Sequence, residues 1–183
     1  PAAAGTADPA WNGHYLDKAN GLLLSVTADG AMLDVRYAHA PERLRLRSEG
    51  TAEAPSMTLA RDGDAIRLRR PSENLSASAV RVADEVTQGL EGRYFSGELD
   101  VWLEIDKAGT ALFGRCEGLM GSGPMHAIHP VGRDVFVLSC QRSMDAPAPG
   151  NWTIQVERDA AEGIRGLVVG CWLARNIAYE KVA

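Results

Sequence analysis

Hydrophobic and polar residues alternate with a period of two along much of the chain. The segments 43–47, 65–69 and 152–156 each place an apolar residue at every second position. That spacing is typical of a strand with one face in the core and one face in water. Glycine-centred turns such as Ala28-Asp-Gly30 separate these strands. The pattern predicts an all-β fold, with helix confined to short stretches around Ala160.

The sequence repeats itself once at a constant offset. Trp11-Asn-Gly13-His-Tyr15 returns 79 positions later as Leu90-Glu-Gly92-Arg-Tyr94. Leu24, Val26 and Gly30 also match residues of the same kind 79 positions on. A repeat of this length signals two copies of one supersecondary unit, so we expect two tandem domains.

We expect the first domain to span residues 9–83 and the second to span 90–183. Residues 84–89 would form a short linker, and residues 1–8 a disordered lead-in rich in alanine. The offset grows from 79 to 97 by Arg158, so the second copy should carry an insertion of 18 residues. Each copy has room for roughly eight strands of five or six residues. Eight short antiparallel strands lose their edges by closing, so we predict two tandem eight-stranded antiparallel β-barrels, lipocalin-like and with little helix.

Composition and charge exclude several classes of function. The chain has 183 residues, is 45% hydrophobic and carries a net charge of −5, which argues against disorder and against nucleic-acid binding. No apolar run reaches the roughly 18 residues of a membrane span, so we expect no membrane partner. Cys116, Cys140 and Cys171 lie too far apart for a disulfide or zinc framework. Unpaired thiols, and the lack of a secretory signal at the start, favour a cytoplasmic location.

The chain offers no constellation for catalysis. None of its three lysines follows a serine by three positions, so there is no Ser-x-x-Lys motif. His126 and His129 would point to opposite faces of a strand, which favours surface histidines over a metal site. The arginines at 43, 45, 47, 67, 69 and 70 favour a solvated strand face over a polyanion groove, because residues 9–83 carry a net charge of only +1. We predict no catalytic residue, no metal and no cofactor.

One segment, Ser139 to Trp152, does not fit the pattern of short turns. Two prolines fix the backbone and should stiffen the stretch from Asp145 to Gly150. Long loops in compact domains are often functional. Arg142 could hold a carboxylate, and Asp145 could hold an ammonium group. Equally, Met144 and Trp152 could belong to a packing loop that covers one end of a barrel.

The same segment resembles a known family. Gln141-Arg-Ser-Met-Asp-Ala-Pro-Ala-Pro-Gly150, followed by Trp152 and Gly166-Leu-Val-Val-Gly-Cys-Trp-Leu-Ala-Arg175, is similar to the C-terminal region of bacterial D-aminopeptidases. Gly92-Arg-Tyr94 and Ser72-Glu-Asn-Leu75 also resemble this family of D-stereospecific serine hydrolases of the penicillin-recognising group. The resemblance implies that the chain holds only the C-terminal barrel domains, B and C. In the family these follow a catalytic domain with a β-lactamase-like fold.

The resemblance also implies a role for the loop. In the family, the last barrel sends a loop into the catalytic cleft, where it narrows the pocket and helps to recognise the free amine of a small peptide substrate. Here that loop is 141–152. Asp145 would contact the α-ammonium group, and Arg142, Ser143 and Met144 would belong to the same substrate site.

The family's catalytic serine and lysine have no counterpart in these residues, so the chain alone should not hydrolyse a substrate. Its expected partners are the β-lactamase-like domain of the same or a parent chain and a peptide with a free N-terminal amine, and a homodimer stays open. Two other functions stay open as well. A stand-alone β-barrel module could bind a small apolar ligand, or the module could mediate oligomerisation.

Overall fold

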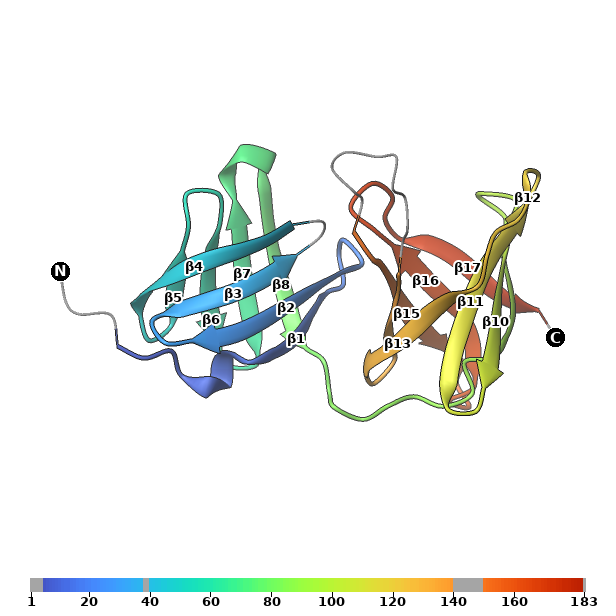
Figure 1. Cartoon of the computed structure of the whole chain (residues 1–183), viewed down its shortest axis with the longest axis horizontal. Helices are drawn as coiled ribbons and strands as arrows, with labels where there is room; N and C mark the ends of the chain where they lie inside the picture. Colours follow the sequence, from blue (N-terminus) through green and yellow to red (C-terminus); the bar gives the residue numbers. More distant parts are fainter. Residues whose placement is uncertain (1–4, 38–39, 140–149, 183) are drawn as a thin grey trace. The chain divides into compact units, whose positions relative to one another are not determined.

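The structure, a computed structural model, describes residues 5–37, 40–139 and 150–182 (Figure 1). Two compact units make up the chain, Pro1–Val82 and Ala83–Ala183. Each is an antiparallel β-barrel with its own hydrophobic core. The prediction of two eight-stranded antiparallel barrels is therefore confirmed. No helix in the described ranges is long and apolar enough to cross a membrane.

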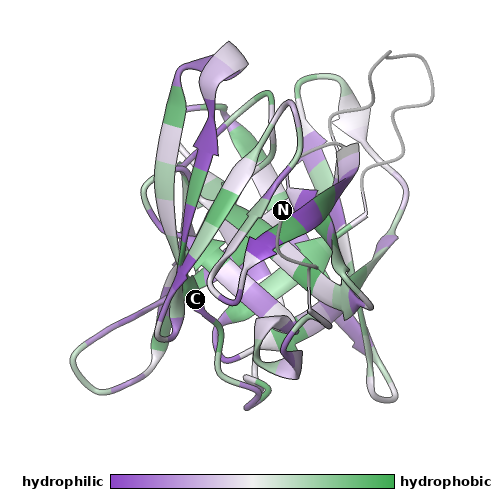
Figure 2. Ribbon diagram, turned by 90° about the vertical axis from the view of Figure 1, so that its left-hand side faces the viewer, coloured by the Kyte–Doolittle hydropathy of each residue, from purple (hydrophilic) through white to green (hydrophobic). Residues whose placement is uncertain are grey.

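The first barrel closes because its last strand pairs with its first, where Tyr15 lies opposite Arg81. Its inward side chains are apolar and fully buried, among them Leu33, Leu44 and Leu59. Green and purple segments follow one another along the strands in Figure 2, as the period of two predicts. Its elements are η1 (Pro9–Trp11), β1 (Gly13–Asp17), β2 (Leu22–Asp29), β3 (Met32–Tyr37), β4 (Ala40–Ser48), β5 (Thr51–Glu53), β6 (Thr58–Asp62), β7 (Ala65–Arg70), η2 (Pro71–Glu73) and β8 (Leu75–Arg81).

The second barrel closes in the same way, with Tyr94 opposite Lys181. Eight of its strands form the ring, and the two-residue strand β12 pairs with the end of β11 as an extension. Its core includes the fully buried side chains of Phe136, Ile154 and Leu167. Its strands are β9 (Gly92–Ser96), β10 (Val101–Ala108), β11 (Ala111–Gly118), β12 (Gly121–Ser122), β13 (His126–Gly132), β14 (Val135–Leu138), β15 (Trp152–Arg158), β16 (Ile164–Gly170) and β17 (Ile177–Val182).

The repeat in the sequence is also a repeat of contacts. The Tyr15 hydroxyl donates to the carbonyl oxygen of Trp11 at 3.1 Å, and the Tyr94 hydroxyl donates to that of Leu90 at 2.7 Å. A cation from the last strand of each barrel lies over the tyrosine ring, 4.8 Å from the centroid for Arg81 and 5.6 Å for Lys181. Each tyrosine thus ties the start of its barrel to the end.

The extra residues of the second copy lie in three connections, not in one insertion. The largest difference is between β14 and β15, where residues 139–151 replace the four-residue link 54–57 of the first barrel. The hairpin 119–125 replaces residues 38–39, and the turn 159–163 replaces residues 63–64. The expected single insertion rested on matching Arg158 to Arg61. In the structure, Val156 lies opposite Leu167 as Arg61 lies opposite Ile66, so Val156 and not Arg158 corresponds to Arg61.

The end of the expected disordered lead-in is held against the first barrel. The Ala7 N–H donates to the carbonyl oxygen of Gly30 at 2.5 Å, and the Ala7 side chain is buried. Asp8 caps the η1 turn by accepting from the Ala10 N–H, and it pairs with Arg61 at 2.8 Å. These two contacts, the N–H bond first, lower the pKa of Asp8. Residues 7 and 8 are therefore ordered and held against the first barrel.

The segment that precedes the second barrel is fastened to it by one aspartate. The Thr87 hydroxyl donates to the Asp134 carboxylate at 2.7 Å and accepts from the Asp134 N–H at 2.8 Å. Arg158 donates to both carboxylate oxygens of Asp134, at 2.7 and 3.0 Å. The Arg158 hydrogen bonds, followed by the Thr87 bond, lower the pKa of Asp134 despite its partial burial. The expected linker, residues 84–89, is therefore fastened to the second barrel at Thr87.

Candidate functional site

The site predicted from the sequence lies on the connection between β14 and β15. Arg142, Ser143, Met144 and Asp145 fall outside the described residues, so their role stays a prediction. The two roots of the connection are described. Leu138 and Trp152 lie opposite each other as the last pair of the β14–β15 ladder, and the half-buried Trp152 packs against the core.

Three other connections leave the second barrel at the same end, because neighbouring strands are antiparallel. They are residues 97–100, 119–125 and 171–176. Large apolar side chains stand exposed on each: Leu119 and Met120 at 98%, Leu173 at 56% and Leu99 at 45%. Exposed apolar groups that gather at one end of a domain mark an interaction surface more often than isolated ones do.

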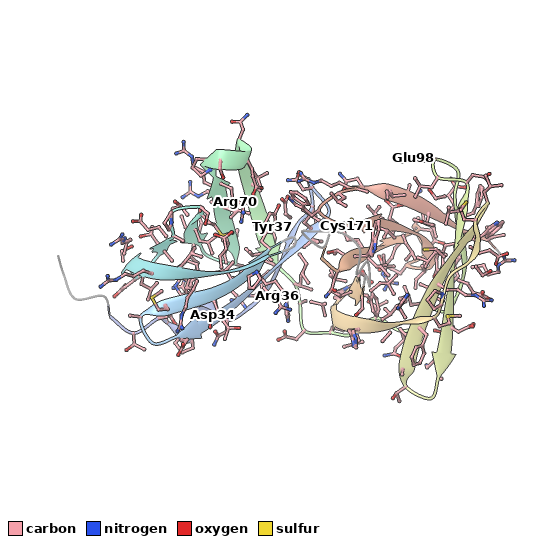
Figure 3. The ribbon with its side chains drawn as sticks, turned by 45° about the horizontal axis from the view of Figure 1, so that its top comes forward. Asp34, Arg36, Tyr37, Arg70, Glu98 and Cys171 are labelled. Carbon is pink, nitrogen blue, oxygen red and sulfur yellow. The ribbon has the colours of Figure 1, made fainter. Side chains whose placement is uncertain are left out.

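The corresponding end of the first barrel is sealed by a polar network. Asp17 is fully buried, and it accepts hydrogen bonds from the Tyr37 hydroxyl at 3.0 Å and from the Asn20 amide at 2.7 Å. Arg70, only 8% exposed, pairs with Glu42 and, at 2.7 Å, with Glu73. Tyr37 and Arg70 are labelled in Figure 3. Buried charges are tolerated here because each has a partner.

The equivalent positions of the second barrel hold small, uncharged side chains. Ser96 and Cys116 stand 79 positions after Asp17 and Tyr37. Cys171, labelled in Figure 3, follows Val169 by two positions, as Arg70 follows Leu68 in the matching strand pair. The ion-paired seal of the first barrel is therefore not repeated.

At this end of the second barrel, one buried polar atom lacks a hydrogen bond. The Ser96 hydroxyl is fully buried and has no hydrogen-bond partner among the described residues. Cys116 is exposed although it shares the inward face of β11 with Leu112 and Gly114, so solvent reaches this end of the interior. Burial, together with the nearby Cys116, raises the pKa of Tyr179 far above its usual range, so Tyr179 stays a neutral phenol.

No pattern in the sequence marked Ser96, Cys116 and Cys171 as a set. The offset of 79 could have found the first two, because it maps them directly onto Asp17 and Tyr37. Cys171 could not be found in this way, since the offset changes across the extra residues of the second copy.

Five of the six arginines singled out from the sequence are exposed, as a solvated strand face predicts, but Arg70 is buried in the ion-paired network described above. Arg43 pairs with Asp29 and Asp34, and Arg47 pairs with Glu53 at 2.6 Å, so acidic neighbours neutralise much of the arginine stripe. Among the described residues, no group of three His, Cys, Asp or Glu side chains is placed to hold a metal ion.

Comparison with known proteins decides the family. A family model described as D-aminopeptidase, domain B, matches residues 4–180. The chain belongs to the D-aminopeptidase domain B family. The match to domain B covers both barrels except the last two residues of β17, whereas the resemblance had divided them between domains B and C.

Curated relatives of this D-aminopeptidase region are much longer. The chain is 41% identical to a D-aminopeptidase of Brucella melitensis biotype 1 over 177 residues, which cover 96% of the chain and 34% of the relative. It is 42% identical to a D-aminopeptidase of Cereibacter sphaeroides over 186 residues, which cover 99% of the chain and 36% of the relative. The chain therefore spans about a third of the length of these relatives.

Proposed function

We propose that the two barrels form the accessory region of a D-aminopeptidase, an enzyme that releases N-terminal D-residues from peptides or amides. Hydrolysis would take place in a β-lactamase-like catalytic domain within the remaining two thirds of the parent protein. The observation that carries the proposal is that relatives named D-aminopeptidase match nearly the whole chain and continue well beyond it.

Within that enzyme, the loop 141–152 would shape the catalytic cleft, and Asp145 would bind the α-ammonium group of the substrate. A carboxylate in a narrow, partly dry cleft attracts a cation more strongly than in bulk water. Such a contact would favour cleavage next to a chain terminus, because only a terminus carries that charge. Arg142, Ser143 and Met144 would complete the same wall. The loop's length and the apolar tips at the same end of the barrel support an outward-facing role.

The test uses the complete parent enzyme with Asp145→Asn and Asp145→Ala. For an anilide of a free-amine D-residue, kcat/KM should fall by about tenfold or more, the cost of one charge-assisted contact. The N-acetylated anilide carries no ammonium group, so its much slower hydrolysis should not change. Asp106→Asn, an exposed aspartate on the outer face of β10, is the matched control and should behave as the unaltered enzyme.

Equal kcat/KM values for the Asp145 variants and the control would remove the assigned role from Asp145. A complete parent protein that cleaves neither anilide would contradict the proposal as a whole.

A further inference from the structure

A pocket of about 200 Å³ lies at the end of the second barrel opposite the connection 139–151. One wall is the anchored segment that precedes β9, and the other walls are the β10–β11 turn and β13. Its apolar floor includes Leu112, Ile128 and Phe136, the last two buried in the core. A cavity of about 150 Å³ accommodates benzene, so a ligand of about eight heavy atoms suits this one.

In the first barrel, the matching lead-in segment lies directly against the turn between β2 and β3. Ala7 is 4% exposed and bonds to the turn at Gly30. Val86 occupies the same place in the repeat, 79 positions on, yet it is 45% exposed. The lead-in of the second barrel therefore stands away from its β10–β11 turn, and the space between them is the pocket.

Two opposite charges line the pocket. Lys107 is the only lysine or arginine among the lining residues, and Glu91 is the only carboxylate. Neither forms an ion pair with another residue in the part of the chain that the structure describes. Both are exposed at the rim, above the apolar floor. An ammonium group and a carboxylate left unpaired beside an apolar surface can each bind a ligand group of opposite charge.

We propose that this pocket binds a free α-amino acid with a small apolar side chain. The ligand carboxylate pairs with Lys107, the ligand ammonium pairs with Glu91, and the side chain covers Leu112 and Ile128. A zwitterion fits better than a simple anion or cation, because either single charge would meet repulsion from one of the two rim groups. The site belongs to this chain alone and does not depend on the proposed peptidase activity.

The pocket is largely preformed, which reduces the entropic cost of binding. Thr87 lines it and is held at both its donor and acceptor sites by Asp134. Asp134 is in turn held by Arg158. A ligand would therefore meet a wall that is already in position.

The test compares three ligands of the same shape by NMR titration of the ¹⁵N-labelled chain. Racemic valine carries both charges, 3-methylbutanoate lacks the amine, and 2-methylpropan-1-amine lacks the carboxylate. We expect valine to shift the amide signals of residues 107–112 and 127–129, with a Kd of about 1 mM. Each one-charge analogue should bind about fivefold more weakly or worse, for the loss of one charged contact.

Three variants in the pocket and one control variant test whether valine binds there. Lys107→Gln and Glu91→Gln should each weaken valine binding about fivefold. Lys107→Gln should then bind valine no better than 2-methylpropan-1-amine, and Glu91→Gln should bind valine no better than 3-methylbutanoate. Ala111→Trp adds a bulky side chain to the lining and should prevent binding. Glu98→Gln, on the 97–100 connection at the other end of the barrel, should bind valine as the unaltered chain does.

Two results would overturn the proposal. One is 3-methylbutanoate binding as tightly as valine, which would indicate an anion site. The other is valine shifts that persist unchanged in Ala111→Trp or that map outside the pocket. Because each variant's own spectrum reports its folding, a variant that unfolds is recognised at once, and the ligand comparison on the unaltered chain still decides.

Discussion

At the scale of single residues, the two barrels differ in how a cation of the last strand contacts the start of the first strand. The cation is Arg81 beside β1 in the first barrel and Lys181 beside β9 in the second. Gly13 and Gly92 both have positive φ angles, +151° and +145°, which disfavour any side chain. A Cβ atom at Gly13 would strike the Arg81 guanidinium, whereas one at Gly92 would lie 3.1 Å from the Lys181 Cε atom. Arg81 donates to three oxygens, those of Ala10, Asn12 and Tyr15, at 2.6 to 2.7 Å. The contact of Lys181 with Gly89 is much longer, at 3.5 Å.

Gly13→Ala should therefore destabilise its barrel more than Gly92→Ala destabilises the other. Backbone strain should cost about 1–3 kcal/mol at either position. Displacing Arg81 should add about 1 kcal/mol or more at Gly13, because its acceptors lose a charged donor. Urea unfolding of both variants gives the two free energies of unfolding. Equal losses would show that Arg81 adapts without cost, and Gly5→Ala, which has open space around it, is the control.

At the scale of elements, the segment before β9 depends on the charge of Asp134. Asp134 sits in a left-handed turn with φ of +60°, which asparagine also tolerates. Asp134→Asn therefore keeps the turn and removes only the carboxylate that holds Thr87 and Arg158. We expect a loss of about 1 kcal/mol, as for a partly exposed ion pair. Faster hydrogen exchange at residues 84–90 should accompany it.

The same carboxylate predicts a pH dependence. The folded pKa of Asp134 lies below its usual value of 3.8. Its stabilising effect is therefore complete above that value and is lost as the pH falls through the lower, folded pKa. The difference in unfolding free energy between the unaltered chain and Asp134→Asn should be constant from pH 6 to pH 5 and should shrink below about pH 4. A difference that stays constant down to pH 2 would rule out Asp134 as the group responsible.

The strands were predictable from the sequence, but their connections were not. Alternation at residues such as Leu44 and Leu46 fixes which face of a strand is buried, and the repeat fixes the number of barrels. Residues 119–125 and 159–163 carry no such periodic signal, so the sequence could not divide the extra residues among three connections. The pocket beside Lys107 was hidden for a similar reason. It depends on how far Val86 stands from a turn, which no local pattern encodes.

At the scale of the whole molecule, the two hydrophobic cores share no residue. One core lies within residues 7–79 and the other within residues 90–179. Leu59 and Ile154 occupy matching positions. Each is fully buried, and each lies opposite a buried residue of the preceding strand, Ala52 for Leu59 and Phe136 for Ile154. Each barrel should therefore unfold as its own cooperative unit.

Leu59→Ala should lower the stability of the first barrel by about 2–5 kcal/mol and leave the second unchanged. Ile154→Ala should do the reverse. Hydrogen exchange measured by mass spectrometry at increasing urea follows peptides of the two barrels separately. If both barrels lose protection together in both variants, the chain unfolds as one unit and the expectation is wrong.

The pairing of first and last strands in each barrel has a wider consequence. Tyr15 lies opposite Arg81, and the Val82 N–H donates to the His14 carbonyl oxygen at 2.8 Å, so the chain leaves the first barrel beside the point where it came in. Tyr94 and Lys181 repeat this in the second barrel. A module with adjacent ends can be copied in tandem, grafted into a host loop or circularly permuted without breaking its ring of strands. Duplication of such a module needs only a short linker, and one copy can then change its sequence while the other keeps its original contacts.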